Sequence, residues 1–329
     1  MTAQAQPSSL ATTDDGRQLY FASDSKIFRI TESGLELFAA LPADLPGYHD
    51  PNIQPRVYLP MVTGDGAVVG FTSDAYCPPF GACLAGAYTT GQLKGRMAGS
   101  PGQGTLSLSR NGKWAVLTAR DYGSIYPWPN SQLIDLENGT AIWIPFPVYP
   151  PVVVAADGAI AQPNHYGGAV WKPNQYIALP LAPQGPGGPV GISDNSRVVV
   201  AFDWWETGSQ HFLAIELKTG AKTTLDWPTD PRIFVSFHGI SNDGTWVLSS
   251  RSDKPGTARI HNSGTAEFEE IRMPEDEAIR EGILSGYGNR AFFVTASRRI
   301  VVVELAGGRP TDVRILCECG ALKAALADQ

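Results

Sequence analysis

Short turns that carry Asp or Asn, usually together with Gly, recur along the whole chain between runs of β-forming residues. Seven such turns are present, spaced about 45 residues apart on average. They are Asp15-Gly16, Asp65-Gly66, Asn111-Gly112, Asp157-Gly158, Asp194-Asn195-Ser196, Asp243-Gly244 and Gly288-Asn289. Helical solenoids have similar periods, but the amphipathic helical patterns that they need are absent here. The repeat therefore predicts a β architecture.

Each repeat contains the elements of a small antiparallel sheet. A β-branched or aromatic run follows the Asx turn, as in residues 198–202 and 291–294. A second run then leads to another Gly turn, such as Asn138-Gly139 or Gly307-Gly308; only the fourth repeat, with Lys172-Pro173-Asn174, lacks it. This order of strand, tight turn, strand, longer loop, strand, tight turn and strand predicts one blade of a β-propeller.

We therefore predict an all-β fold, a seven-bladed β-propeller with four antiparallel strands per blade. A count of six or eight blades stays open, because the long stretch at residues 39–58 could contain an irregular strand. The propeller is predicted as a single domain over residues 1–316, followed by a C-terminal tail at 317–329. The predicted blades cover about 8–40, 58–99, 104–147, 151–183, 188–228, 233–274 and 279–316.

The first repeat reads Leu-Ala-Thr-Thr-Asp-Asp-Gly-Arg-Gln-Leu-Tyr-Phe-Ala-Ser from Leu10 to Ser23. It resembles the Ser-Pro-Asp-Gly-Lys-x-Ile-x-Phe-x-Ser repeat of TolB-like propellers, which are similar to WD-repeat propellers. The resemblance spans all seven repeats, although the Pro before Asp-Gly is missing from each. It implies the fold and no single function, since that repeat occurs in periplasmic scaffolds, peptidase propellers and secreted proteins.

Charge and hydropathy exclude two classes of partner. The chain has 25 Lys and Arg against 32 Asp and Glu, a net charge of -7, so it has no basic field for nucleic acid or anionic lipid. The longest uncharged apolar stretch, residues 141–156, contains four prolines and is too short for a membrane span. We expect no nucleic-acid partner, no membrane insertion and a monomer.

The cysteines bear on the compartment. Cys77 and Cys83 flank a short Pro/Gly loop that could close a local disulfide, which would favour an oxidising compartment. Cys317 and Cys319 favour a disulfide or free thiols over zinc, because no His lies close in sequence. The first seven residues have no signal-peptide pattern. We expect an extracytoplasmic protein, periplasmic or secreted, whose signal peptide is absent from this sequence; a cytoplasmic start is the alternative.

The longer loops suggest the working face. In a propeller, the loops between second and third strands lie on the same face as the blade-to-blade connections, and here the second, third and fifth blades carry the longest of them. In these blades an Asp is followed by aromatic residues, which could converge on a ligand at the channel mouth. The predicted ligand-binding residues are Asp74, Tyr76, Asp121, Tyr122, Tyr126, Trp128, Asn164, His165, Asp203, Trp204, Trp205 and His238. The alternative is that each Asp forms an Asx turn and the rings pack locally.

Histidines on the same face raise the question of a metal or a general base. His49 and His238 lie in or near predicted inter-blade connections, and His165 could join them. No His-x-x-x-His spacing supports this grouping, so structural histidines are the alternative and we predict no metal site.

Two functions follow from these features. The first is a non-catalytic binding or scaffold propeller that holds a protein segment or a small polar ligand on the long-loop face of blades two to five, without a cofactor. The alternative is a hydrolase or lactonase that uses a divalent cation, such as calcium, at the channel mouth. Its available ligands would be Asp74, Asp121, Asn164, Asp203 and His238. No catalytic residue is assigned, and the Gly-x-Ser-x-Gly and phosphate-loop patterns are absent from the sequence.

Overall fold

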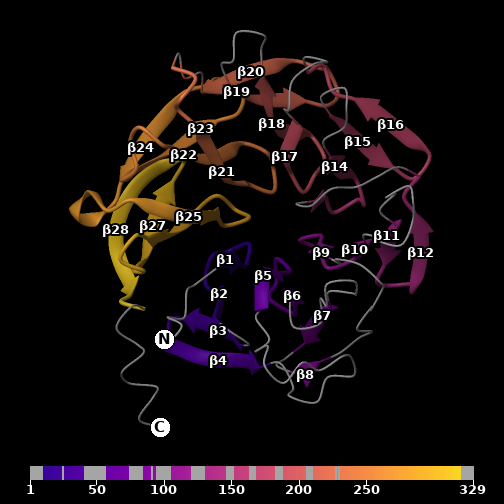
Figure 1. Cartoon of the computed structure of the whole chain (residues 1–329), viewed down its shortest axis with the longest axis horizontal. Helices are drawn as coiled ribbons and strands as arrows, with labels where there is room; N and C mark the ends of the chain where they lie inside the picture. The colour runs from indigo at the N-terminus through magenta and orange to yellow at the C-terminus, as the bar shows by residue number, and fades with distance from the viewer. Residues whose placement is uncertain are drawn as a thin grey trace. The chain divides into compact units, whose positions relative to one another are not determined.

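The computed structural model (Figure 1) describes residues 10–23, 26–40, 57–73, 84–89, 92–93, 105–119, 130–145, 152–162, 168–181, 188–204, 210–226, 228 and 230–319. Within these ranges the regular structure is β-strand apart from one short 3-10 turn, η1 (Pro274–Asp276). No helix in this part of the chain has the length and apolarity of a membrane span. Most of the irregular stretch predicted at residues 39–58, and the tail beyond 319, lie outside the described residues.

The strands form seven antiparallel sheets of four strands each, and every sheet follows chain order. The first three sheets contain β1 (Leu10–Thr12), β2 (Leu19–Ser23), β3 (Lys26–Thr31), β4 (Gly34–Ala40), β5 (Val57–Val62), β6 (Val68–Ser73), β7 (Leu84–Thr89), β8 (Gln92–Leu93), β9 (Thr105–Leu108), β10 (Trp114–Ala119), β11 (Asn130–Asp135) and β12 (Thr140–Trp143). The other four contain β13 (Val153–Val154), β14 (Ile160–Gln162), β15 (Ala169–Lys172), β16 (Gln175–Ala178), β17 (Gly188–Ile192), β18 (Val198–Trp204), β19 (Gln210–Glu216), β20 (Lys222–Asp226), β21 (Val235–Ile240), β22 (Trp246–Arg251), β23 (Thr257–Asn262), β24 (Phe268–Arg272), β25 (Ile279–Leu284), β26 (Arg290–Thr295), β27 (Ile300–Ala306) and β28 (Arg309–Cys317). The predicted fold class, a seven-bladed β-propeller with four antiparallel strands per blade, is confirmed.

The chain divides into two compact units. One contains Met1–Thr13 and Arg17–Gly158, and the other contains Asp14–Gly16 and Ala159–Gln329. In the second unit the first strands of successive blades contact one another, β17 with β21 and β21 with β25, while β24 and β28 are outer strands in contact (Figure 1). The prediction of a single domain over 1–316 stays a prediction.

The recurring Asx turn joins the first strand of each blade to the second, and a buried hydroxyl explains its sequence. Ser193 Oγ donates to Asn195 Oδ1 at 2.7 Å and accepts from the Val198 backbone N at 3.0 Å. In the next blade, Ser241 Oγ makes the equivalent bonds to Asp243 Oδ1 at 2.6 Å and from the Trp246 N at 2.9 Å. The repeated Ser or Thr two residues before the Asx residue therefore closes the turn from inside, where an unpaired hydroxyl would be costly.

Neighbouring turns are also hydrogen-bonded to each other. In the second unit, the Asn195 N donates to Asn242 O at 3.2 Å, and Asn195 Nδ2 donates to Asp243 O at 3.1 Å. Asn289 Nδ2 donates likewise to Asp15 O at 3.2 Å. Asn195 and Asn289 lie two and four residues after the serines of their turns, and each accepts from its serine through Oδ1 and reaches a neighbouring turn through Nδ2, whereas an Asp could supply only the acceptor. The polar groups of this face are largely used within the fold.

Replacing Asn195 with Asp tests this link. The variant keeps the oxygen that caps the turn but turns a donor into an acceptor beside Asp243 O, so we expect a loss of about 1 kcal/mol in the free energy of unfolding. Asn262→Asp is the matched control, because Asn262 Oδ1 caps Gly264 N and Thr265 N and no bond from its Nδ2 is seen. Urea unfolding should show a lower midpoint for Asn195→Asp only; equal midpoints would contradict the link.

The fourth blade shows why one expected Gly turn was missing from the sequence. Its turn between β15 and β16 has no Gly, and Asn174 takes the left-handed conformation there, with φ of 68°. Asn tolerates this region better than other residues with a Cβ, because its short polar side chain bonds locally. The hairpin therefore forms without the usual signal.

The core consists of the inward residues of adjacent blades. In blades six and seven, Leu248, Ile260, Phe293, Val301 and Val303 form one buried cluster, with Trp246 packed against its edge. A second cluster joins blade five to blade six and includes the fully buried Phe212. Burial of these large side chains between sheets holds neighbouring blades together.

Candidate functional site

The described residues include only part of the predicted ligand-binding set. Outside the described residues lie Asp74, Tyr76, Asp121, Tyr122, Tyr126, Trp128, Asn164, His165 and Trp205. His49 of the proposed histidine group and the Cys77–Cys83 pair also lie outside them. Trp204 is the last residue of β18. Whether the predicted set converges therefore stays a prediction, and only Asp203 and His238 have described side chains.

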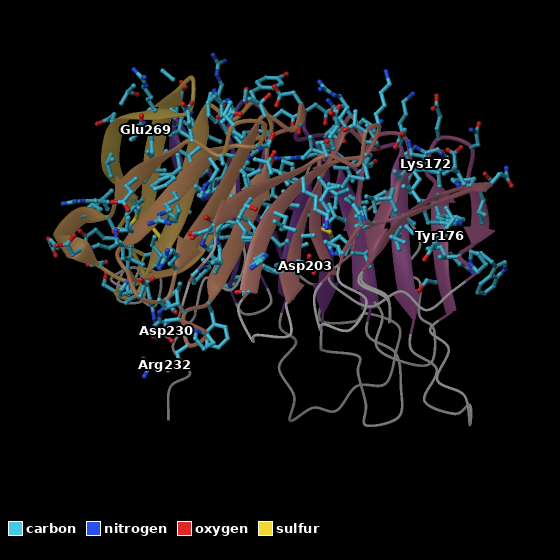
Figure 2. All side chains as sticks on the ribbon, turned by 90° about the horizontal axis from the view of Figure 1, so that it is seen from above. Lys172, Tyr176, Asp203, Asp230, Arg232 and Glu269 are labelled. Carbon is cyan, nitrogen blue, oxygen red and sulfur yellow. A yellow bond between two sulfur atoms is a disulfide. The ribbon has the colours of Figure 1, made fainter. Side chains whose placement is uncertain are left out.

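Asp203 lies near the end of β18, at the predicted working face. It is 4% exposed and stands directly opposite His211 of β19 in the ladder. Burial lowers the pKa of His211, and the negative charge of Asp203 raises it by a smaller amount. In the second unit, Asp203, Asp230 and Arg232 lie toward one face, away from Lys172 (Figure 2). That the loop after Asp203 belongs to a ligand-binding face stays a prediction.

His238 lies inside β21, where a β-bulge changes its direction. Phe237 pairs with Ser249 and Gly239 pairs with Leu248, so His238 is the extra residue of the first strand of blade six. Its Nε2 lies 2.8 Å from Ser250 Oγ, and its ring meets the edge of Phe293. Burial lowers the pKa of His238 to about 4, which leaves the imidazole neutral at pH 7. These contacts fit the structural alternative better than a metal ligand.

A bulge recurs in the first strands of three successive blades, three residues before the turn serine in β17 and β21 and five residues before it in β25. The extra residue is Val190 in β17, His238 in β21 and Arg280 in β25. Bulges re-aim side chains and are common beside functional sites. Arg280 is exposed and shows no ion pair within the described part of the chain. The first strands of blades five and six therefore present different side chains, Val190 and His238, from equivalent bulge positions.

An exposed aromatic residue that sequence analysis did not select lies before β21. Phe234 is 55% exposed, although its backbone N donates to Ser252 Oγ at 2.9 Å and its backbone O accepts from Ser252 N at 3.0 Å. Two residues earlier, Arg232 makes a two-pronged ion pair with Asp230, with Nε–Oδ1 3.0 Å and Nη2–Oδ2 2.8 Å. The Arg232 guanidinium lowers the pKa of Asp230 to about 2. The signal in the sequence was Asp-x-Arg-x-Phe in an inter-blade connection rather than in a long loop.

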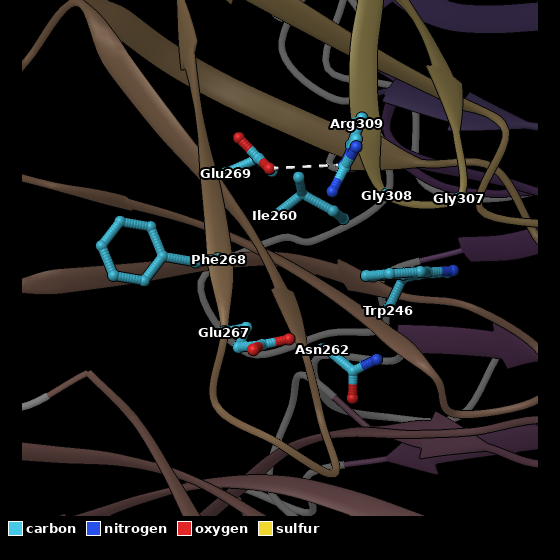
Figure 3. A pocket seen from close by; sticks show the side chains of 9 residues that line it. All are labelled: Trp246, Ile260, Asn262, Glu267, Phe268, Glu269, Gly307, Gly308 and Arg309. Carbon is cyan, nitrogen blue, oxygen red and sulfur yellow. Dashed lines mark ion pairs between the residues drawn. The ribbon is translucent and has the colours of Figure 1, made fainter.

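A groove of about 390 Å³ lies between the outer strands of blades six and seven (Figure 3). Trp246 and Ile260 line it, and the exposed Phe268 forms one side. Glu269 of β24 and Arg309 of β28 form an ion pair across it, with Oε1 and Nε 3.6 Å apart. Both partners of this pair are largely exposed, so it holds the strands only weakly.

Acidic and sulfur ligands do not cluster in the described part of the chain. Groups of three or more His, Cys, Asp or Glu side chains placed to hold a metal ion are not found among those residues. Most of the ligands that the hydrolase alternative would need lie outside it, so the calcium prediction is not tested.

Neither a protein-family model nor a curated protein matches the sequence. Solved structures do match. A chain from a study of two prolyl endopeptidases has 11% identity and a TM-score of 0.59, over 95% of this chain and 51% of that chain. The extracellular domain of a one-component system from B. thetaiotaomicron has 12% identity and a TM-score of 0.54, over 96% of this chain and 39% of that one. TolB from Acinetobacter baumannii has 12% identity and a TM-score of 0.49, over 80% of this chain and 62% of TolB.

The likeness is one of fold. At sequence identities this low, the likeness does not indicate an activity, a substrate or a partner for this chain. The chain spans about half of the prolyl endopeptidase chain that it matches and less of the extracellular domain chain. With the seven four-stranded sheets and the repeated Asx turn, the resemblance to TolB-like propellers is confirmed at the level of the fold.

Proposed function

We propose that this protein is a binding propeller, with a protein segment or a small polar ligand held on the long-loop face. The observation that carries the proposal is the exposed ring of Phe234. The backbone of this residue is fixed by two hydrogen bonds with Ser252. An exposed aromatic residue on a fixed backbone loses little conformational entropy on binding, and Arg and aromatic residues dominate interface hot spots.

The opposite face supports the same assignment. On that face the Asx turns are hydrogen-bonded to each other: the side-chain amide of Asn195 donates to the Asp243 carbonyl, and that of Asn289 donates to the Asp15 carbonyl. A surface whose polar groups already have partners offers few to a ligand. Arg232, at 88% exposed, lies two residues before Phe234, and its Nη1, which the pair with Asp230 does not use, can donate a hydrogen bond to a ligand. Within the second unit, the proposed surface therefore adds the connection between blades five and six to the predicted loops of blades four and five.

We also propose an extracytoplasmic location. The disulfide between Cys317 and Cys319 supports it, since disulfides persist in oxidising compartments and are rare in reducing ones. The extracellular domain among the fold neighbours is compatible with this location and carries no further weight.

A thermal-shift screen tests the binding proposal. Peptide and saccharide panels, and calcium, magnesium, manganese and zinc with and without EDTA, are compared for their effect on the melting temperature. The compounds that stabilise are titrated against Phe234→Ala and against Tyr176→Ala, which removes an exposed aromatic ring from the outer strand β16. We expect at least about tenfold weaker binding for Phe234→Ala and unchanged binding for Tyr176→Ala.

Two results would contradict the proposal. Equal binding by wild type and Phe234→Ala would remove this surface from the site. Stabilisation by one divalent cation alone, abolished in Asp203→Asn, would favour the metal-dependent hydrolase or lactonase instead.

A further inference from the structure

A disulfide joins two cysteines that are only two positions apart at the end of the last strand. Cys317 is the final residue of β28 and pairs with Ile300, while Cys319 lies beyond the ladder. Both residues are half-buried, and the residue between them, Glu318, is exposed. A shift in register between Ile300 and Val301 leaves Leu316 without a ladder partner just before the disulfide. The bond therefore lies in a small loop at the margin of blade seven.

Such a disulfide does little to hold the fold together. A cross-link stabilises mainly by shortening the unfolded chain, and the effect grows with the length of the closed loop. Here the loop contains only the residue between the cysteines. The ladder from Val301 to Ala306 pairs β27 with β28 independently of the bond, and Val301 and Val303 are buried in the core. Opening the disulfide therefore requires no rearrangement of the blade.

We propose that Cys317 and Cys319 form a thiol–disulfide exchange site that reacts reversibly with external dithiols. A thiolate of the dithiol attacks Sγ of one cysteine, a new S–S bond forms, and the Cys317–Cys319 bond breaks. The electron pair leaves on the other cysteine Sγ, which takes a proton from water. The second sulfur of the dithiol, as its thiolate, then attacks the first dithiol sulfur in the mixed disulfide; the bond from that sulfur to the cysteine Sγ breaks, and the Sγ takes the electron pair and a proton from water. The dithiol is oxidised to a cyclic disulfide by two electrons, and the protein is reduced to two thiols.

The short spacing makes the reverse reaction efficient. The two thiols stay adjacent on a fixed strand end, so re-oxidation is an intramolecular step after attack on an external disulfide. A reactive cysteine pair must be accessible to an external thiol and must not be needed for the stability of the fold. The half-buried loop at the end of the ladder meets both conditions.

Charge around the pair determines which thiols react fastest. Arg299 Nε lies 3.5 Å from Glu318 Oε1, and Arg299 Nη1 pairs with Glu275 at 3.0 Å and Glu277 at 2.9 Å. Three carboxylates, one of them on the residue between the two cysteines, therefore share the single positive charge of Arg299. A net negative field slows anionic thiols, so an aminothiol such as cysteamine should reduce the bond faster than mercaptoethanesulfonate does.

Alkylation with mass spectrometry follows the reaction in the full chain. Trypsin cuts after Arg314 and Lys323, so the peptide 315–323 contains Cys317 and Cys319 and neither Cys77 nor Cys83. Under native conditions in millimolar dithiothreitol, we expect two labels on this peptide within minutes and a melting temperature that hardly changes. Protein that is re-oxidised with oxidised glutathione before alkylation should take neither label. Cys319→Ser should instead hold a stable mixed disulfide on Cys317.

Glu318→Gln tests the charge argument without touching the cysteines. It should reduce the preference for cysteamine over mercaptoethanesulfonate by severalfold, and Glu269→Gln, an exposed Glu on β24, should leave that preference unchanged. The proposal is overturned if native protein resists dithiothreitol for hours, or if reduction lowers the melting temperature strongly. The first result would mean an inert bond, and the second a structural staple.

Discussion

Lowering the pH from about 7.5 to about 5 is expected to remove about 4 kcal/mol from the free energy of unfolding, about 2 kcal/mol for each of two histidines. His261 is completely buried, its Nε2 lies 2.9 Å from Ser249 Oγ, and its Nδ1 has no hydrogen-bond partner in the described part of the chain. Burial, with the charge of Arg259 as a smaller cause, lowers the pKa of His261 to about 3. Burial lowers the pKa of His238 to about 4.

The direction follows from proton binding. The folded protein keeps both imidazoles neutral, whereas the unfolded chain binds protons on them below about pH 6.5. Stability is therefore complete above that pH and falls as the pH drops toward the folded pKa values. His211, whose pKa is also lowered by burial, acts in the same direction. Carboxylates with lowered pKa values, such as Asp253 and Glu270, lose their contribution only below their unfolded values near pH 4, so the histidines dominate between about pH 6.5 and pH 5.

His261→Phe separates this effect from other titrations. The new ring keeps the packing against Phe212 and Phe268, whose centroids lie 6.2 Å and 5.5 Å from the imidazole. Urea unfolding at several pH values should show a pH dependence about half as steep as in the wild type, whatever the change in stability at pH 7. A wild-type slope in the variant would mean that His261 is protonated in the folded protein.

The fold was predictable because its signal is local and repeated. In six blades the Asx turn uses a Ser or Thr hydroxyl together with a left-handed residue, so a similar short pattern recurs in the sequence. In the fourth blade Ala155 stands where the hydroxyl would be, and Asn174 instead of Gly supplies the left-handed conformation of the second turn, yet both hairpins form. The other six repeats were enough to predict the blade.

The candidate site was less predictable because its features depend on tertiary structure. The bulge at His238 comes from pairing with β22, and Gly239, a Gly inside the strand, is a sequence sign of a bulge that the analysis did not use. Phe234 has the sequence character of a core residue, and only the pairing of its backbone with Ser252 leaves the ring in solvent. Sequence analysis selected aromatic residues in long loops and therefore did not consider a short connection.

Replacing Asp226 with Ala is expected to lower the free energy of unfolding by about 3 kcal/mol. Asp226 ends β20 in blade five, and its carboxylate accepts hydrogen bonds from Arg251 Nη1 at 3.2 Å and Arg259 Nη1 at 2.7 Å, both from blade six. Its side chain is 5% exposed. Without it, two poorly hydrated guanidiniums face a gap between the blades. Each keeps a second acidic partner, Asp253 or Glu270, which places the loss at the low end for a buried pair.

Asp230→Ala is the matched control, since its pair with Arg232 is a solvent-exposed one and its loss should change the unfolding midpoint little. A triple variant, Asp226→Ala with Arg251→Met and Arg259→Met, identifies the cause. If the loss comes from leaving charges uncompensated, the triple variant will be at least as stable as Asp226→Ala alone, because apolar chains of similar length fill the gap without a desolvation cost. If the triple variant is instead less stable than Asp226→Ala, by the sum of the losses from its three substitutions, then the ion pairs themselves stabilise the contact between blades five and six.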